Sequence, residues 1–189
     1  VPMCGIVAFF ARRHPVSESA LAHATESLHH RGPDGRRHWI SADRTVGLGH
    51  ARLSIIDLTT GDQPIASEDG RTRIVVNGEF YGYEAIQREL EARGHHLRTR
   101  SDSEIALHLY EDFGAQCLHH LRGEFAFVLW DEYRRTILAA RDRFGIKPKR
   151  AGGGMDERLA STGWFTKLVR RPEAGAAGGL LATIVIFAL

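Results

Sequence analysis

The chain is 189 residues long, with 43% hydrophobic and 25% charged residues and a formal net charge of +2. These values are ordinary for a globular protein and exclude collagen, a coiled coil and wholesale disorder. A charge this close to zero gives no general reason to expect nucleic acid as a partner. The length predicts one domain, with at most a short appendage.

The cysteine content and the apolar segments near the two ends of the chain indicate where in the cell the protein is expected. Cys4 and Cys117 are too few for a disulfide framework and are typical of reduced thiols, so we expect a cytoplasmic protein. The apolar run at 4–11 is followed rather than preceded by arginines, so we expect no secretory signal. The apolar residues 174–189 are shorter than the roughly 20 that a membrane span needs, which disfavours membrane attachment.

The predicted elements mix strands and helices along the chain. Residues 101–104, Ser-Asp-Ser-Glu, have the spacing of a capping box at the start of a helix. In chain order we expect a strand at 4–10, a helix at 17–30, a turn at 31–35, strands at 38–41, 45–56 and 73–81, helices at 84–93 and 101–110, and a hairpin of strands at 124–131 and 135–142. Hairpins without regular strand–helix–strand alternation predict an α+β fold with a largely antiparallel sheet.

Cys4 is the first candidate for chemistry. A cysteine at a chain terminus carries its own base, because a free α-amine has a pKa of about 7.7–8.0. Val1, Pro2 and Met3 precede Cys4 here, and while they remain its nitrogen is an amide, which is not a base. The alternative interpretation is a small buried residue on a strand.

Four further residues could serve a binding site. Asn77 and Gly78 follow an apolar strand, where a side-chain amide and a backbone N–H can aim at one oxygen, although an Asn-Gly turn has the same sequence. Arg52 could bind a carboxylate through its fork or lie on the surface. Asp102 could pair with an ammonium group or serve only the first turn of a helix.

Metal and phosphate sites are not expected. The adjacent histidines at 29–30, 95–96 and 119–120 lack the companion ligands and spacings of known zinc motifs. The glycines at 152–154 lack the Gly-Lys-Ser/Thr ending of a phosphate-binding loop and are typical of a linker.

Seven motifs together resemble one family. They are Met-Cys-Gly-Ile-Val at 3–7, His-Arg-Gly-Pro-Asp-Gly at 30–35, Gly-His-Ala-Arg-Leu-Ser-Ile at 49–55, Val-Asn-Gly-Glu-Phe-Tyr at 76–81, Ser-Asp-Ser-Glu at 101–104, Gly-Glu-Phe-Ala-Phe at 123–127 with Leu-Trp-Asp at 129–131, and Arg-Asp-Arg-Phe-Gly-Ile-Lys-Pro at 141–148. In this order they resemble the N-terminal glutaminase domain of glutamine-hydrolysing asparagine synthetases, which are class II (N-terminal nucleophile) amidotransferases.

The resemblance implies a fold, a reaction and a set of site residues. The implied fold is a four-layer αββα sandwich of antiparallel sheets, and the implied reaction is hydrolysis of L-glutamine to glutamate and ammonia through a thioester. The implied catalytic residues are Cys4, Asn77 and Gly78, with Cys4 as nucleophile and the other two holding the oxyanion. The implied substrate-binding residues are Arg52 for the α-carboxylate, Glu79 and Asp102 for the α-ammonium, and Leu53, Ser54, Ile55 and Ile56 along the pocket.

The resemblance also sets the expected extent of the domain. Residues 3–148 match the family, and 149–189 are expected to be a non-family tail that is disordered or a truncated end, because the family continues into a synthetase domain. ATP and magnesium are expected only for that domain, and no cofactor for the glutaminase step. Gly82 stands where the family usually has Asn, for which local loosening is expected.

Two alternatives stay open. One is a catalytically silent remnant that binds glutamine, suggested by the residues before Cys4 and by the unfamiliar tail. The other is the glutaminase of a different amidotransferase, because the acceptor of ammonia is not visible in these motifs. A homodimer or a separate synthetase partner is compatible with either.

Overall fold

The computed structural model describes residues 4–11, 13–54 and 61–143, together with the strands at 150–152, 167–170 and 183–187. These residues form two five-stranded sheets, ordered β2-β3-β1-β10-β8 and β4-β5-β6-β7-β9, and every strand pairing is antiparallel. The elements are β1 (Gly5–Phe10), α1 (Glu18–Glu26), β2 (Gly35–Ile40), β3 (Val46–Arg52), β4 (Ile65–Ala66), β5 (Thr72–Phe80), α2 (Tyr83–Ala92), α3 (Ser103–Phe113), a 3-10 helix (Gly114–His119), β6 (Gly123–Asp131), β7 (Thr136–Arg141), β8 (Arg150–Gly152), β9 (Lys167–Arg170) and β10 (Thr183–Phe187).

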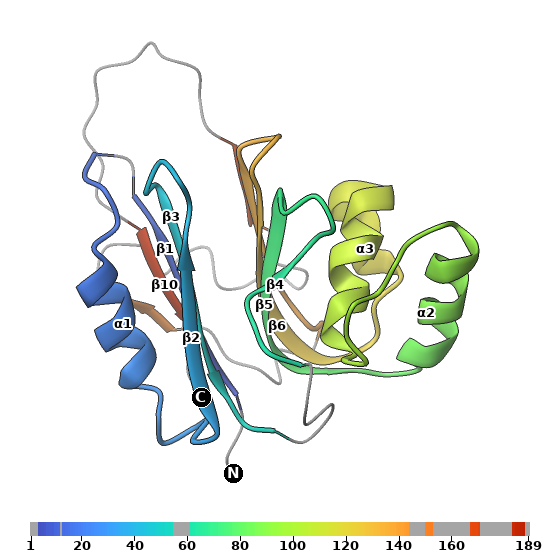
Figure 1. Ribbon diagram of the computed structural model, residues 1–189, viewed down its shortest axis with the longest axis horizontal. Helices are drawn as coiled ribbons and strands as arrows, with labels where there is room; N and C mark the ends of the chain where they lie inside the picture. The colour runs from blue at the N-terminus through green and yellow to red at the C-terminus, as the bar shows by residue number, and fades with distance from the viewer. Residues whose placement is uncertain are drawn as a thin grey trace.

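The elements stack in four layers (Figure 1). Helix α1 covers the outer face of the first sheet, and α2 and α3 cover the outer face of the second. The two sheets face each other in the middle of the molecule, where β5 packs against β1 and β3. The expectation of an α+β sandwich in the order αββα is confirmed.

Three hydrophobic clusters fill the three spaces between these layers. Ile6 and Val75 belong to the cluster between the sheets, whereas the next residue of β1, Val7, packs with Leu21 of α1. On β5 the next residue, Val76, belongs to the cluster beneath α2 and α3. Successive side chains of a strand point to opposite faces, so continuous apolar runs are what strands covered on both faces require.

Several predicted boundaries are wrong, two of them by four residues. The first helix ends at Glu26 instead of residue 30, and β3 ends at Arg52 instead of residue 56. The capping box does not form either, because Asp102 occupies the N-cap and the Glu104 carboxylate turns away from it. That carboxylate instead accepts hydrogen bonds from the backbone nitrogens of Arg98 and Thr99, at 2.8 and 2.7 Å.

The backbone conformation at residue 82 explains why glycine can stand where the family usually has asparagine. Gly82 is the N-cap of α2 and has φ +68°, in the left-handed region. Glycine and asparagine are the residues that enter this region most readily, so either can begin the helix here.

Three of the strands lie beyond residue 148. β10 pairs with β1 in the first sheet, and β9 pairs with β7 in the second. β8 pairs with β10. Over these segments the structure has paired strands where the sequence predicts a disordered tail, and the domain boundary at 148 stays a prediction.

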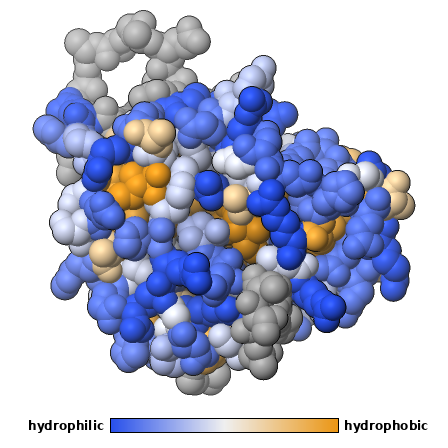
Figure 2. Space-filling model, in the orientation of Figure 1, coloured by the Kyte–Doolittle hydropathy of each residue, from blue (hydrophilic) through white to orange (hydrophobic). Residues whose placement is uncertain are grey.

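The surface seen in Figure 2 is mostly hydrophilic, with hydrophobic residues gathered in small, separate patches. Within the described ranges, no helix combines the length and the apolar character that crossing a membrane requires.

Candidate active site

Cys4 lies at the start of β1, beside the end of β3. Its Sγ atom accepts a hydrogen bond from the backbone nitrogen of Leu53 at 3.3 Å and lies 3.5 Å from the Leu53 carbonyl oxygen. The antiparallel pairing of Gly5 with Ala51 sets this register. The thiol is partly buried, and it lies one residue before β1 begins, beside the residue at which β3 ends.

The turn at 31–35 fixes the backbone around the thiol. Arg31 Nε donates to the Cys4 carbonyl oxygen at 3.4 Å, and Asp34 Oδ2 accepts from the Ser54 nitrogen at 2.7 Å. Gly32 packs directly on the backbone of Ala51, because a Cβ atom there would lie 2.3 Å from the Ala51 carbonyl carbon. The glycine therefore allows the turn to approach the site closely.

Arg52 is buried and is already ion-paired on one side. Its Nη1 atom lies 2.7 Å from Asp62 Oδ1, and the other oxygen of Asp62 lies 2.6 Å from Arg37 Nη2. A guanidinium has five donors in a fixed fork, so it can bind more than one acceptor group. Asp62 is a residue that the sequence analysis missed.

Asn77 and Gly78 lie inside β5, so the alternative of an Asn-Gly turn is wrong. Asn77 is buried and pairs with Ala126 across β6. Gly78 has φ +138°, and a Cβ atom there would lie 1.9 Å from the Glu124 carbonyl oxygen. Only glycine fits this distorted position, where β5 and β6 approach closely.

Asp102 closes the opposite side of the site. The residue is buried, and its Oδ2 atom accepts a hydrogen bond from the Phe80 nitrogen at 2.6 Å. Burial raises the pKa of Asp102, and the negative charge of Glu79 raises it further. Glu79 is exposed, whereas Asp102 is buried, and a buried carboxylate repelled by a neighbouring one is stabilised by a cation, such as an ammonium group.

Electrostatic interactions connect the two sides. Burial raises the pKa of the Cys4 thiol, the Leu53 N–H and Arg52 lower it, and Asp102 raises it again. Arg52 on the first sheet and Asp102 on α3 therefore both act on the sulfur atom. The thiol is protonated at neutral pH and needs a base before it can attack.

His50 and Gln63 are further buried polar residues of this region. Burial, with a contribution from Arg52, lowers the pKa of His50 to about 4, so the ring is neutral. Gln63 Oε1 accepts from the Val76 nitrogen at 2.6 Å, and its Nε2 lies 3.3 Å from Ser103 Oγ. Both residues were missed because single polar residues at these positions carry no spacing signal.

The predicted residues are distributed as follows. Cys4, Arg52, Leu53 and Ser54 meet at the end of the first sheet, and Asn77, Gly78, Glu79 and Asp102 come from β5 and the start of α3. Ile55 and Ile56 lie outside the described residues.

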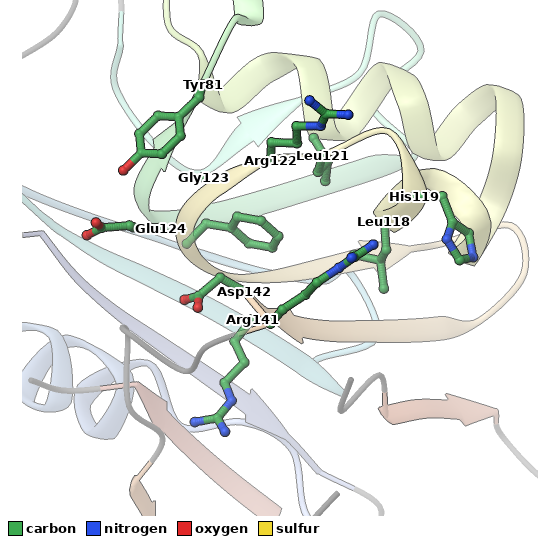
Figure 3. A pocket seen from close by; sticks show the side chains of 11 residues that line it. Tyr81, Leu118, His119, Leu121, Arg122, Gly123, Glu124, Arg141 and Asp142 are labelled. Atoms are coloured by element: carbon green, nitrogen blue, oxygen red, sulfur yellow. The ribbon is translucent and has the colours of Figure 1, made fainter. Parts of the chain in front are cut away.

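A separate cavity of about 530 Å³ opens beside β6 and β7 (Figure 3). Tyr81, Leu118, Arg122, Glu124 and Asp142 are among its lining residues, and none of the predicted site residues within the described part of the chain is among them. The cavity is therefore not the candidate active site.

Comparison with known proteins assigns the family. The family described as "Glutamine amidotransferase domain" matches residues 3–173 of the chain. The chain belongs to this family. Its curated relatives include "Amidase chry2" of Gibberella zeae, with 48% identity over 77% of this chain and 23% of the relative.

Other relatives of this glutamine amidotransferase domain are asparagine synthetases. "Asparagine synthetase [glutamine-hydrolyzing] 3" of Bacillus subtilis is 41% identical over 77% of the chain and 24% of its own length. The protein of the same name from Arabidopsis thaliana is 39% identical over 86% of the chain and 27% of its own length. The chain thus spans about a quarter of the length of these curated relatives.

Solved structures share the fold at low sequence identity. The structure titled as that of the allosteric regulatory enzyme of purine biosynthesis aligns with a TM-score of 0.69 and 19% identity, over 97% of this chain and 42% of its own. The glutamine phosphoribosylpyrophosphate amidotransferase of Bacillus subtilis aligns with a TM-score of 0.67, also at 19% identity, over 88% of this chain and 49% of its own. At this identity the likeness concerns the fold alone.

Proposed function

We propose that this domain is the glutaminase part of an enzyme of the asparagine synthetase type, hydrolysing L-glutamine to glutamate and ammonia with Cys4 as nucleophile. The observation that carries the proposal is the placement of Cys4 Sγ against the Leu53 backbone, with Arg52 and Asp102 both acting on it. These two opposite charges match the charged groups on the α-carbon of an amino acid.

Substrate recognition follows from the charges. Arg52, oriented by Asp62, binds the α-carboxylate through its guanidinium group. Asp102 and Glu79 bind the α-ammonium, and its positive charge offsets the repulsion between their carboxylates. The side-chain amide of glutamine then extends toward Cys4 Sγ.

The first chemical step is attack of sulfur on the amide carbon. The α-amine of Cys4 takes the thiol proton, the S–C bond forms, and the carbonyl electrons move to oxygen. Asn77 and the Gly78 N–H are assigned to that oxyanion, because fixed donors stabilise charge as it develops. Collapse of the intermediate breaks the C–N bond, and the nitrogen takes the proton from the α-amine of Cys4. Ammonia departs, and a thioester with Cys4 remains.

The second step is hydrolysis of the thioester. The α-amine takes a proton from water, the new C–O bond forms, and cleavage of the C–S bond releases glutamate and restores the thiol. Both steps need a free α-amine, so we propose that Val1, Pro2 and Met3 are removed before the enzyme acts.

The acceptor of ammonia is assigned through the relatives. The asparagine synthetases of Bacillus subtilis and Arabidopsis thaliana match over most of this chain, which supports asparagine as the product of the larger enzyme. ATP and magnesium are assigned to the synthetase part of that enzyme and not to the glutaminase step. Because Cys4 and Cys117 are both free thiols, we propose a cytoplasmic location.

The experiment is a glutaminase assay on two matched forms of the protein. One form is the 189-residue chain, and the other begins at Cys4 after cleavage of a removable leader. Intact mass identifies the first residue of each, and glutamate release is then measured. We expect turnover only where the mass begins at Cys4.

The controls separate catalysis from folding. Cys4→Ala in the form with the processed start lowers turnover by more than about 1,000-fold, because no other group forms the thioester. Cys117→Ala is the matched control and retains turnover, since that thiol is buried in the core beneath the helices. Glutamine hydrolysis that survives Cys4→Ala contradicts the proposal.

A further inference from the structure

Three potential metal ligands converge between the α2–α3 connection and helix α3. His95 Nδ1 lies 3.2 Å from His108 Nδ1, and Glu111 Oε2 lies 3.0 Å from His108 Nδ1 and 3.5 Å from His95 Nδ1. The two rings meet edge to face, with centroids 5.0 Å apart. The three atoms thus form a nearly equilateral triangle outside the candidate active site.

The size of this triangle fits an ion with tetrahedral coordination. Zinc binds histidine nitrogen at about 2.0–2.1 Å, which places two ligands of a tetrahedron roughly 3.3 Å apart. The three observed separations of 3.0, 3.2 and 3.5 Å bracket that value. An ion could therefore enter with shifts of a few tenths of an ångström at most.

The backbone holds each ligand in place beforehand. His108 and Glu111 are three residues apart on α3, so they share one face of the helix. His95 follows the end of α2, where its backbone nitrogen donates to the Leu90 carbonyl oxygen at 3.1 Å. Ligands fixed by separate elements before the ion arrives favour binding.

The second nitrogen of each ring faces a carboxylate. His95 Nε2 lies within hydrogen-bond distance of Asp112 Oδ1, at 2.9 Å. His108 Nε2 lies 3.5 Å from Glu104 Oε1 and makes no hydrogen bond among the described residues. Metal-bound histidines characteristically donate their other N–H to such a group, which fixes the ring and its tautomer. The remaining oxygen of Asp112 lies 3.3 Å from Arg93 Nη1.

Burial and charge agree with a cation site that is open on one side. The His108 side chain is 2% exposed, that of His95 15% and that of Glu111 31%, so solvent reaches the triangle from the glutamate. With Glu104 and Asp112 the cluster contains three carboxylates around two imidazoles, and the guanidinium of Arg93 pairs with Asp112.

We propose that His95, His108 and Glu111 bind a divalent transition-metal ion, with Zn²⁺ as the best match, and that water completes the coordination. The ion joins the α2–α3 connection to α3, the helix that begins beside Asp102. Its role is structural, because all three ligands lie away from Cys4. The sequence analysis considered only adjacent histidines and so missed ligands that are 13 and 3 positions apart.

The experiment is metal binding by the chelator-treated 189-residue chain. Zn²⁺ is titrated by calorimetry, and Co²⁺ is used as a visible probe because its d–d absorption is intense in tetrahedral sites. We expect one ion per chain and a melting temperature that rises with added Zn²⁺, since an ion that binds only the folded state stabilises it.

Three variants and a matched control locate the ion. His95→Gln and Glu111→Gln each remove a ligand, and we expect each to weaken binding at least as much as the roughly 10–100-fold loss expected for Asp112→Asn, which removes only an outer partner. His96→Gln is the control, because His96 is the exposed neighbour of His95 and contributes only its backbone nitrogen, which donates to Glu68. It should bind as the wild type does.

Several outcomes overturn the proposal. One is no uptake at micromolar Zn²⁺ by the wild type, which leaves His108 as a protonated ring between carboxylates. Another is uptake that His95→Gln and Glu111→Gln leave unchanged. A third is loss of uptake in Cys4→Ser alone, accompanied by a cobalt–thiolate charge-transfer band, which places the ion on the thiol. Circular dichroism of each variant confirms that a loss of binding is not a loss of folding.

Discussion

The two sheets contribute opposite charges to the candidate active site. The first sheet brings the thiol of Cys4 together with the guanidinium of Arg52, and Arg31 donates to the Cys4 backbone. The second sheet and α3 bring the carboxylates of Glu79 and Asp102. The proposed substrate, a zwitterionic amino acid, requires both of these charges, and neither sheet alone supplies them.

The halves are also held in different ways. Around Cys4 a turn fixes the backbone through a close glycine contact and hydrogen bonds at 31–34. Around Asp102 the constraint is the close approach of β5 to β6, where Gly78 and Gly123 both have positive φ. Substitutions in the first half should therefore change mainly the position of the Cys4 thiol. Substitutions at the glycines of the second half should change the stability of the whole second sheet.

The largest expected effect is that of Gly78→Ala. The new methyl group would lie 1.9 Å from a backbone oxygen at a φ that alanine rarely adopts, so we expect a loss of more than about 3 kcal/mol in the free energy of unfolding. Gly70→Ala is the control, because φ is +72° there but no atom lies within 4 Å, and about 1–2 kcal/mol is expected. Urea unfolding measures both, and equal losses would show that the contact with β6 costs nothing.

The next effect separates the two charged halves by substrate. Arg52→Gln and Asp102→Asn should each lower kcat/KM for glutamine by about 10–100-fold, since each removes a hydrogen bond between charged groups. For 4-aminobutanamide, which lacks the carboxylate, Arg52→Gln should have little effect. For glutaramic acid, which lacks the amine, Asp102→Asn should have little effect. The opposite result, in which each variant loses activity on the substrate that lacks its own binding partner, would contradict the assigned roles.

A smaller effect concerns pH. The pKa of His50 is about 4 in the folded chain against an ordinary 6.5, so below pH 6.5 the unfolded chain binds a proton that the folded chain does not. Stability therefore falls as the pH drops from 6.5 toward 4, by about 1.4 kcal/mol at pH 5.5. Urea unfolding at pH 7.5 and 5.5 checks this, and His50→Gln should reduce the difference by that amount. An unchanged difference would mean that His50 does not carry the effect.

Much of the fold follows from local patterns. The apolar run of β1 predicted a strand because residues such as Ile6 and Val7 are buried on opposite faces. Gly94 correctly marked the end of α2, where φ is +96°. The end of α1 at Glu26 and the two-residue β4 were not predictable, because tertiary contacts decide such short pieces.

The candidate site could be proposed from the sequence only through the resemblance. Taken singly, Arg52 and Asp102 each had an ordinary structural interpretation, and Asp62 gave no signal because its partners lie 10 and 25 positions away. The failed capping box has a similar cause. Glu104 has partners in the preceding loop that a spacing rule does not consider, and they take both of its oxygens.

The neighbouring residues Asp62 and Gln63 join the two halves of the site through a single peptide unit. Asp62 holds Arg52 of the first sheet, while Gln63 is bonded to Val76 of β5 and lies beside Ser103, the residue after Asp102. Adjacent Cα atoms are about 3.8 Å apart whatever the surroundings. The distance between Arg52 and Asp102, which are proposed to bind the carboxylate and the ammonium, therefore depends on covalent geometry as well as on packing. Inserting one residue between positions 62 and 63 should then weaken selection for α-amino acids even in a chain that still folds.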